Sequence, residues 1–194
     1  MADNDLIIAL SKNDPQTKRD LFEKQYELMA GIAVRYSKND AQAKDLMFAA
    51  FDNTLQAFLN QRSKSEINFE EFFEKQFIYE AVQFIKAIRS EYYVASTVYA
   101  PSDRDKNYNL FDNNEIIDFN AVEMPVLIKS FQELVPSQRL VFNIFVIEGI
   151  DILAISEMLE ASEQTVKSNL EKARYNLQKN IEKNVKFVKH EQTL

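Results

Sequence analysis

The side chains of this chain that could do chemistry are few, and most of them are carboxylates. Cysteine is absent, and the only histidine is His190, near the C-terminus. We therefore expect neither a Ser-His or Cys-His catalytic pair nor a thiolate metal site. Glu70, Glu71 and Glu74 stand at helical spacing, but no spacing typical of metal ligands accompanies them. We interpret them as a solvated helix face and expect a protein that is not an enzyme and uses no cofactor.

A second feature of the sequence lies between Leu134 and Arg174. Apolar residues recur there as in a helix, a short helix and a long helix that pack together. Ser162 stands where its hydroxyl can cap the long helix by accepting backbone N–H bonds. The pattern predicts a helix-turn-helix. Its core residues would be Val141, Phe142, Ile144, Phe145, Ile152, Ile155, Leu159, Val166, Leu170 and Ala173.

The exposed face of that long helix would carry polar side chains. It would present Gln164, Lys167, Ser168, Glu171 and Lys172. From Glu163 onward seven Lys and Arg stand against four acids, a local charge of +3, whereas the residues before Glu163 carry −10. The net charge of −7 argues by itself against an ordinary nucleic-acid binder. Charge alone also fits a solvated amphipathic helix, so both interpretations stay open.

Composition predicts an all-helical fold. Only two Gly and four Pro occur in 194 residues, and good helix formers are abundant. No apolar run approaches the roughly 20 residues of a membrane span, and the N-terminus lacks the basic start of a signal peptide. We therefore expect a protein of the cytoplasm.

Apolar spacing predicts helices over 16–36, 41–59 and 69 to about 92. The aromatic residues of the third helix could stack on unpaired bases, but acidic residues outnumber basic ones along it, so we assign most of its phenylalanines to the core. Tyr79 and Tyr92 stay open as stacking groups, as does Tyr93. The second helix would bury one stripe, formed by Ala43, Leu46, Met47, Ala50, Phe51, Leu55 and Phe58.

A polar segment, VASTVYAPSDRDKNYNLFDNNE, covers residues 94–115. Its many Asn and Asp residues and its proline predict a linker between domains. The sequence thus predicts one helical domain over residues 1–93 and a second over residues 116–194, which contains the helix-turn-helix.

Two motifs in the second domain carry a resemblance to a known family. LVPSQRLVFNIFVIEG, from Leu134, is similar to an L-P-P-x-Q-R-x-V-F segment. ILAISEMLEASEQTVKSNLEKAR, from Ile152, is similar to E-I-A-x-x-L-G-I-S-x-x-T-V-K-S-x-L-x-R-A-R. Both patterns belong to region four of the bacterial RNA polymerase sigma factors of the extracytoplasmic-function class, so the chain resembles a divergent member of that class.

The first domain keeps the order of the family's region two. LFEKQYELMAGIAVRYSKNDAQAKDLMFAAF, from Leu21, is similar to the opening of that region. It differs where the family usually has a Gln-Glu pair, because Phe48 and Ala49 stand there. Region four differs at Ala154, Glu160, Asn169 and Glu171. Glu160 takes the place of a turn glycine, so its backbone is expected to be strained at positive φ.

The resemblance implies an alternative sigma factor with two helical domains, region two and region four, joined by a polar linker. Such a protein binds core RNA polymerase and directs promoter recognition and transcription initiation. Its partners would be core RNA polymerase and promoter DNA, with an anti-sigma factor as a further candidate. The residues implied to bind DNA are Gln164, Lys167, Ser168, Lys172 and Arg174. Those implied to bind polymerase are Asp45, Phe48, Ala49 and Asp52.

A second interpretation stays open. The charge of −10 before Glu163 and the apolar pair Phe48-Ala49 also suit a degenerate sigma-like protein without promoter activity. Such a protein would act through protein–protein binding, as an anti-sigma partner or decoy.

Overall fold

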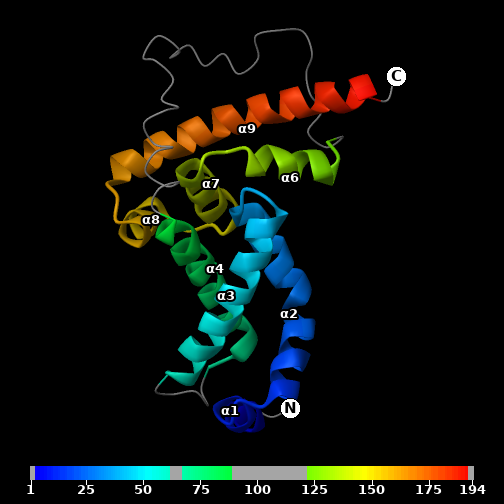
Figure 1. Cartoon of the computed structure of the whole chain (residues 1–194). Coiled ribbons are helices and arrows are strands. Elements are labelled where there is room, and N and C mark those ends of the chain that lie inside the picture. Colours follow the sequence, from blue (N-terminus) through cyan, green and yellow to red (C-terminus); the bar gives the residue numbers. More distant parts are fainter. Residues whose placement is uncertain (1–2, 62–66, 89–121, 192–194) are drawn as a thin grey trace. The chain divides into compact units, whose positions relative to one another are not determined.

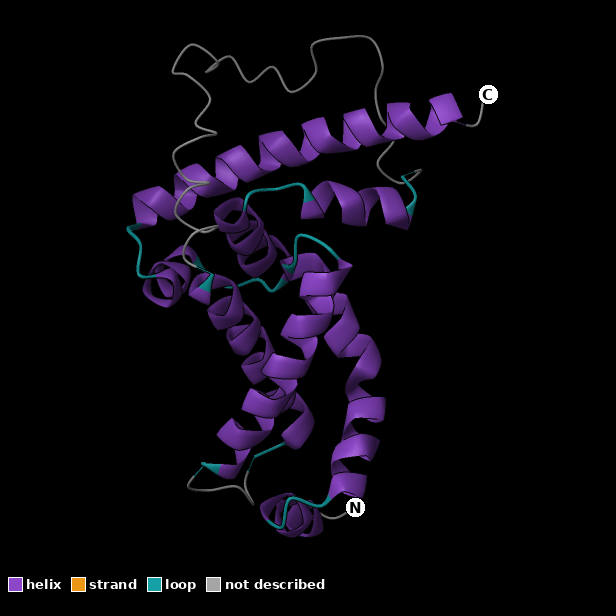
Figure 2. Cartoon of the chain, viewed as in Figure 1, coloured by secondary structure: helices purple, strands orange, loops and turns teal. Residues whose placement is uncertain are grey.

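The computed structural model describes residues 3–61, 67–88 and 122–191, and within these ranges every regular element is a helix (Figure 2). The predicted all-helical class is therefore confirmed for the described residues. No helix in them is long and apolar enough to cross a membrane. The linker predicted over 94–115 lies outside the described residues, as do Tyr92 and Tyr93. The chain divides into two compact units, Met1–Ala87 and Ile88–Leu194.

The first unit contains α1 (Asp3–Ser11), α2 (Pro15–Tyr36), α3 (Asp40–Leu59) and α4 (Phe69–Ala87) (Figure 1). The three long helices pack against one another. Their predicted positions were right to within a residue at most ends. The third, which the apolar pattern extends to about 92, is described as a helix only as far as Ala87.

Capping residues fix where the helices of the first unit begin. Asp14 accepts a hydrogen bond from the backbone N–H of Thr17 at 2.8 Å, and Pro15 supplies a preset φ for the first turn of α2. Asn39 accepts from the backbone N–H of Gln42 at 2.9 Å and caps α3 in the same way. These side chains satisfy amide groups that have no partner inside the helix.

Phenylalanine dominates the core of the first unit. The stripe predicted for α3 is buried in full, from Ala43 to Phe58. Phe58 meets Phe69 edge to face, with ring centroids 4.9 Å apart, and Phe73 lies against Phe77 at 5.9 Å. Burying each ring contributes about 1.5–3 kcal/mol, so aromatic packing within α4 and between α3 and α4 stabilises this unit.

The second unit contains α6 (Met124–Gln132), α7 (Pro136–Phe142), a π-helical turn η4 (Asn143–Ile147), α8 (Ile152–Leu159) and α9 (Glu163–Glu191). The π turn, which periodicity did not predict, continues α7 and precedes a tight loop. Of the ten residues predicted for the core, seven are buried. The other three, Phe142, Phe145 and Ile152, are half-buried.

α9 is the long helix that runs from orange to red in Figure 1, and α6 lies along it. The apolar stripe of α9 continues past Arg174 through Leu177 and Ile181, which pack on Phe131 and Leu134. This second cluster explains why α9 extends well beyond the helix-turn-helix motif.

Candidate functional site

The residues implied to bind DNA lie at the start of α9, where the sequence sets the geometry of the turn. Asp151 caps α8 by accepting from the backbone N–H of Ala154 at 2.9 Å. Glu160 ends α8 with φ 53° and ψ 42°, in the left-handed region. Ser162 then accepts from the backbone N–H of Thr165 at 3.1 Å, as predicted, and its Oγ lies 2.9 Å from the Thr165 hydroxyl oxygen. The predicted cap of α9 and the predicted positive φ at Glu160 are both confirmed.

The implied DNA-binding side chains form two rows on α9. Gln164, Ser168 and Lys172 follow one another at four-residue spacing, and Lys167 lies two turns before Arg174. Gln164, Lys167 and Arg174 are exposed, whereas Ser168 and Lys172 are half-buried. The structure therefore places all five on one side of one helix, with polar atoms that can donate hydrogen bonds to phosphate or to base edges.

Acidic side chains lie among these rows. The Lys167 Nζ is 3.2 Å from a Glu163 carboxylate oxygen. Glu171 is exposed and stands between the rows by helical spacing. Asn169, by contrast, turns toward the body of the unit, because its Oδ1 accepts a hydrogen bond from the Ser137 hydroxyl of α7 at 3.4 Å, while its amide donates to the Thr165 carbonyl oxygen at 3.1 Å. The positive field at this surface is consequently weak.

Arg139 and Gln138 match the region-four motif of the family, and both have a structural role in the second unit. Arg139 is 1% exposed and donates from Nη1 to the carbonyl oxygens of Gln132 and Leu134, at 2.9 and 2.8 Å. Gln138 is buried and accepts from the Asn176 amide of α9 at 2.8 Å. These bonds fix α6, α7 and α9 to one another and thereby set the position of the exposed face of α9.

The residues implied to bind polymerase form a single stripe on α3. Asp45 stands three and four residues before Phe48 and Ala49, and Asp52 follows them by four and three, so all four share one side of the helix. Both aspartates are exposed, Ala49 is half-buried, and Phe48 leaves 47% of its surface exposed. An aromatic ring at the centre of an exposed stripe, between two carboxylates, is suited to contact with another protein.

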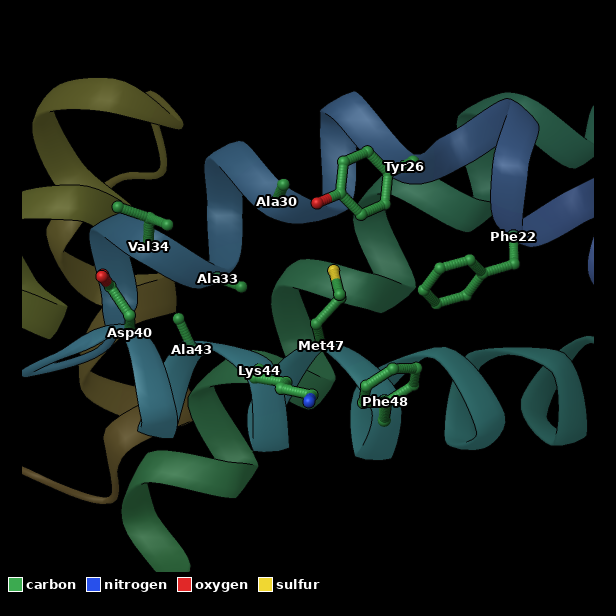
Figure 3. A pocket seen from close by; sticks show the side chains of 10 residues that line it. All are labelled: Phe22, Tyr26, Ala30, Ala33, Val34, Asp40, Ala43, Lys44, Met47 and Phe48. Atoms are coloured by element: carbon green, nitrogen blue, oxygen red, sulfur yellow. The ribbon is translucent and has the colours of Figure 1, made fainter.

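Phe48 also forms one edge of an apolar groove between α2 and α3 (Figure 3). The groove has a volume of about 370 Å³. The ring of Phe22 stacks on that of Phe48, with centroids 5.5 Å apart and planes 9° from parallel. The groove is lined by Phe22, Tyr26, Ala30, Ala33, Val34, Asp40, Ala43, Lys44, Met47 and Phe48.

The contribution of α2 to this groove was not predicted from the sequence. Tyr26 is one of the apolar residues whose helical spacing predicts the helix over 16–36, yet it is 49% exposed. A signal was available, because Phe22 and Tyr26 lie four residues apart on one face of their helix and Phe48 stands on the surface implied to bind polymerase. Of the three tyrosines left open as stacking groups, Tyr79 is the one that lies in the described ranges. It is on α4 and is 44% exposed.

Two glutamates of α4 form ion pairs on its surface. The Lys24 Nζ donates to Glu70 at 2.6 Å, and the Lys75 Nζ donates to Glu71 at 2.7 Å. These hydrogen bonds lower the pKa of both carboxyl groups, and the bond to Glu71 raises the pKa of Lys75. Among the residues that the structure describes, no group of three or more His, Cys, Asp or Glu could hold a metal ion.

No protein-family model matches this sequence, and no curated protein matches it either.

Proposed function

We propose that this protein is an alternative sigma factor, which binds core RNA polymerase and directs it to promoters. The observation that supports this most is the exposed polar face at the start of α9. Ser162 caps the helix, the turn at Glu160 separates it from α8, and five side chains able to contact DNA lie on one side. In this function α8 and α9 form a helix-turn-helix with α9 in the major groove.

Each side chain has a role in that complex. The Gln164 amide, in the first turn of α9, can donate to and accept from a base edge, and Ser168 reaches the same groove one turn later. Lys167, Lys172 and Arg174 contact phosphates, which hold the helix in register. The protein reads DNA and carries out no chemistry of its own.

The acidic groups at this surface make DNA binding by the protein alone weak. Glu163 partly neutralises Lys167, and Glu171 repels phosphate. Tight promoter binding then depends on polymerase, which the α3 stripe around Phe48 contacts. Polymerase supplies further phosphate contacts of its own.

Fluorescence anisotropy with labelled promoter fragments, with and without core polymerase from the same organism, tests the proposal. We expect binding at low salt that strengthens when polymerase is added. Lys167→Ala should weaken it, whereas Lys179→Ala, three turns further along α9, serves as a matched control. Absence of binding at low salt in both conditions contradicts promoter recognition.

The second candidate is a sigma-like protein that acts only through protein binding. The exposed Phe48 with its groove, together with the acids beside Lys167, favours it. Co-purification followed by mass spectrometry separates the two. Polymerase subunits in the eluate support the sigma factor, whereas an anti-sigma protein without polymerase supports the second candidate.

A further inference from the structure

Four asparagines of α9 face α6 and α7 and form what we call the asparagine row. The row consists of Asn169, Asn176, Asn180 and Asn184. Its members are separated by seven, four and four residues, so they lie on one side of the helix. Toward α7, Asn169 accepts from the Ser137 hydroxyl at 3.4 Å and Asn176 donates to Gln138 at 2.8 Å. The other two contact α6, so the row spans both helices that pack along α9.

Asn180 and Asn184 bind α6 through a single serine. The Asn180 Nδ2 donates to the Ser130 carbonyl oxygen at 3.0 Å, and the Asn184 Nδ2 donates to the Ser130 Oγ, also at 3.0 Å. The Ser130 hydroxyl in turn donates to the Val126 carbonyl oxygen at 2.7 Å. Ser130 has no exposed surface and Asn184 is 3% exposed, so water cannot replace these partners. The observed alignment of the two helices thus satisfies both oxygens of Ser130.

Apolar packing alone leaves a second alignment open. Leu177 and Ile181 pack on Phe131 and Leu134, and Val185 follows on α9 at the same four-residue spacing. If α6 moved by one helical turn, about 5.4 Å, toward the C-terminal end of α9, Ile181 and Val185 would take the places of Leu177 and Ile181. Aliphatic side chains would replace one another, so the apolar contacts do not distinguish the two alignments.

Polar contacts do distinguish them. Moving α6 by one turn would carry the Ser130 Oγ beyond Asn184, the last asparagine of the chain, and leave this oxygen without a donor. It would also separate Glu133 from the Lys183 Nζ, which lies 3.4 Å from a Glu133 carboxylate oxygen. A buried oxygen without a donor is unfavourable. A buried amide among apolar side chains can therefore fix one alignment at some cost in stability, as Asn does in the core of coiled coils.

We propose that Asn180 and Asn184 are positioning residues that hold α6 in one alignment on α9. Without their amides, α6 also occupies the alignment one turn nearer the C-terminal end of α9. Arg139 of α7 donates to the carbonyl oxygens of Gln132 and Leu134 at the end of α6, so movement of α6 also affects α7. This role is conformational, goes beyond the proposed function and does not depend on contact between α9 and DNA.

The distance between two nitroxide labels tests the proposal. Because the chain has no cysteine, Glu123→Cys, just before α6, and Glu171→Cys, on α9, carry the only labels, and both positions are exposed. Double electron–electron resonance on the labelled full chain should show one narrow distance. Asn180→Leu combined with Asn184→Leu should add a second population. Its distance should be longer by about 5.4 Å, because α6 runs antiparallel to α9 and moves away from Glu171 (Figure 1).

Lys179→Leu is the matched control, since it adds a leucine on the exposed side of α9. Its label distance should stay single. Urea unfolding, followed by circular dichroism, separates positioning from stabilisation and verifies that the variants are folded. We expect the double leucine variant to have a urea midpoint equal to or above that of the wild type, because leucine buries no amide.

A single, unchanged distance in the double leucine variant would overturn the proposal. If its urea midpoint also falls, the two asparagines serve stability alone. A second distance that appears equally with Lys179→Leu would overturn the proposal too. If the double leucine variant does not fold, Ser130→Ala decides, because it removes the hydroxyl that Asn184 contacts and adds no volume. It should show the longer distance as a smaller population, and a single distance in this variant would contradict the proposal.

Discussion

The backbone conformation of Glu160 shapes the turn between α8 and α9, and this turn sets the orientation of α9. Glu160 adopts φ 53°, where a residue with a Cβ is about 1–2 kcal/mol less stable than glycine. Neighbouring hydrogen bonds hold it there, since the Ala161 N–H donates to the Ser156 carbonyl oxygen at 3.0 Å and Ser162 caps the next helix. The turn thus keeps its geometry even though it contains no glycine.

We predict that Glu160→Gly makes the second unit more stable than Glu160→Ala by about 1 kcal/mol. Both changes remove the same side chain beyond Cβ, so the difference isolates backbone strain. Urea unfolding followed by circular dichroism measures it. An alanine variant as stable as the glycine variant would show that the turn is not strained.

Arg139 is a buried charge with a structural role. We predict that Arg139→Ala lowers the free energy of unfolding of the second unit by about 3 kcal/mol, because the carbonyls of Gln132 and Leu134 lose their donor. The exposed Arg174→Ala should change it by less than about 0.5 kcal/mol. Similar losses in the two variants, measured by denaturant unfolding, would contradict the assignment of Arg139 to packing.

Single residues were predictable where their role is local. The cap at Ser162 follows from its own residue type and position, whereas the positive φ at Glu160 was predicted from the resemblance, which places a turn glycine there. The exposure of Tyr26 was not predicted. An apolar stripe shows which residues share one face of a helix, but it does not show how much of that face the neighbouring helices cover.

At the scale of elements, an ion pair connects α2 to α4. Lys24 donates to Glu70 at 2.6 Å and lowers the Glu70 pKa below its ordinary value of 4.5. A carboxyl group whose pKa is lower in the folded state stabilises the protein above its unfolded pKa. That contribution is lost as the pH falls through the folded pKa. Because both side chains are more than half exposed, it is small.

We therefore predict that Glu70→Gln destabilises the first unit slightly at about pH 6 and has a smaller effect at about pH 3. Lys24→Met should have the same effect, and the double variant should show no further loss. Urea midpoints at the two pH values measure this. An effect of Glu70→Gln that grows as the pH falls would have the wrong sign.

The exposed face of α9 should determine the salt dependence of DNA binding. We predict that Lys167→Ala reduces the slope of log affinity against log salt by about one unit, as loss of one phosphate contact requires. Lys179→Ala should leave the slope unchanged. A titration of affinity against salt, in the presence of core polymerase, measures both. Equal slopes for the wild type and Lys167→Ala would remove Lys167 from the DNA interface.

Helix positions were largely predictable, and the failures have physical reasons. Proline and Asn or Asp caps fix the starts of α2 and α3. The π turn at Asn143–Ile147 was missed because its backbone bond from the Glu148 N–H to the Asn143 carbonyl oxygen at 3.0 Å leaves no trace in an apolar pattern. The packing of α6 along α9 was not predicted either, because it depends on tertiary contacts between segments that are distant in the sequence.

At the scale of the whole molecule, the two units carry different candidate surfaces. The second presents the polar face of α9, and the first presents Phe48 and the groove. The residues of the α9 face and of the stripe around Phe48 were predicted from the sequence. The groove was not, because its walls come from two helices and their spacing depends on how the helices pack. In the proposed sigma factor, polymerase binding by one unit compensates for weak DNA binding by the other.

Transcription in vitro tests the proposed sigma activity most directly. Core polymerase from the same organism is incubated with the protein and a library of genomic fragments, and run-off products are sequenced. We predict transcripts that start at defined sites, depend on the protein, and decrease with Lys167→Ala but not with Lys179→Ala. No protein-dependent transcript from any fragment, from polymerase that is active with another sigma factor, would contradict it.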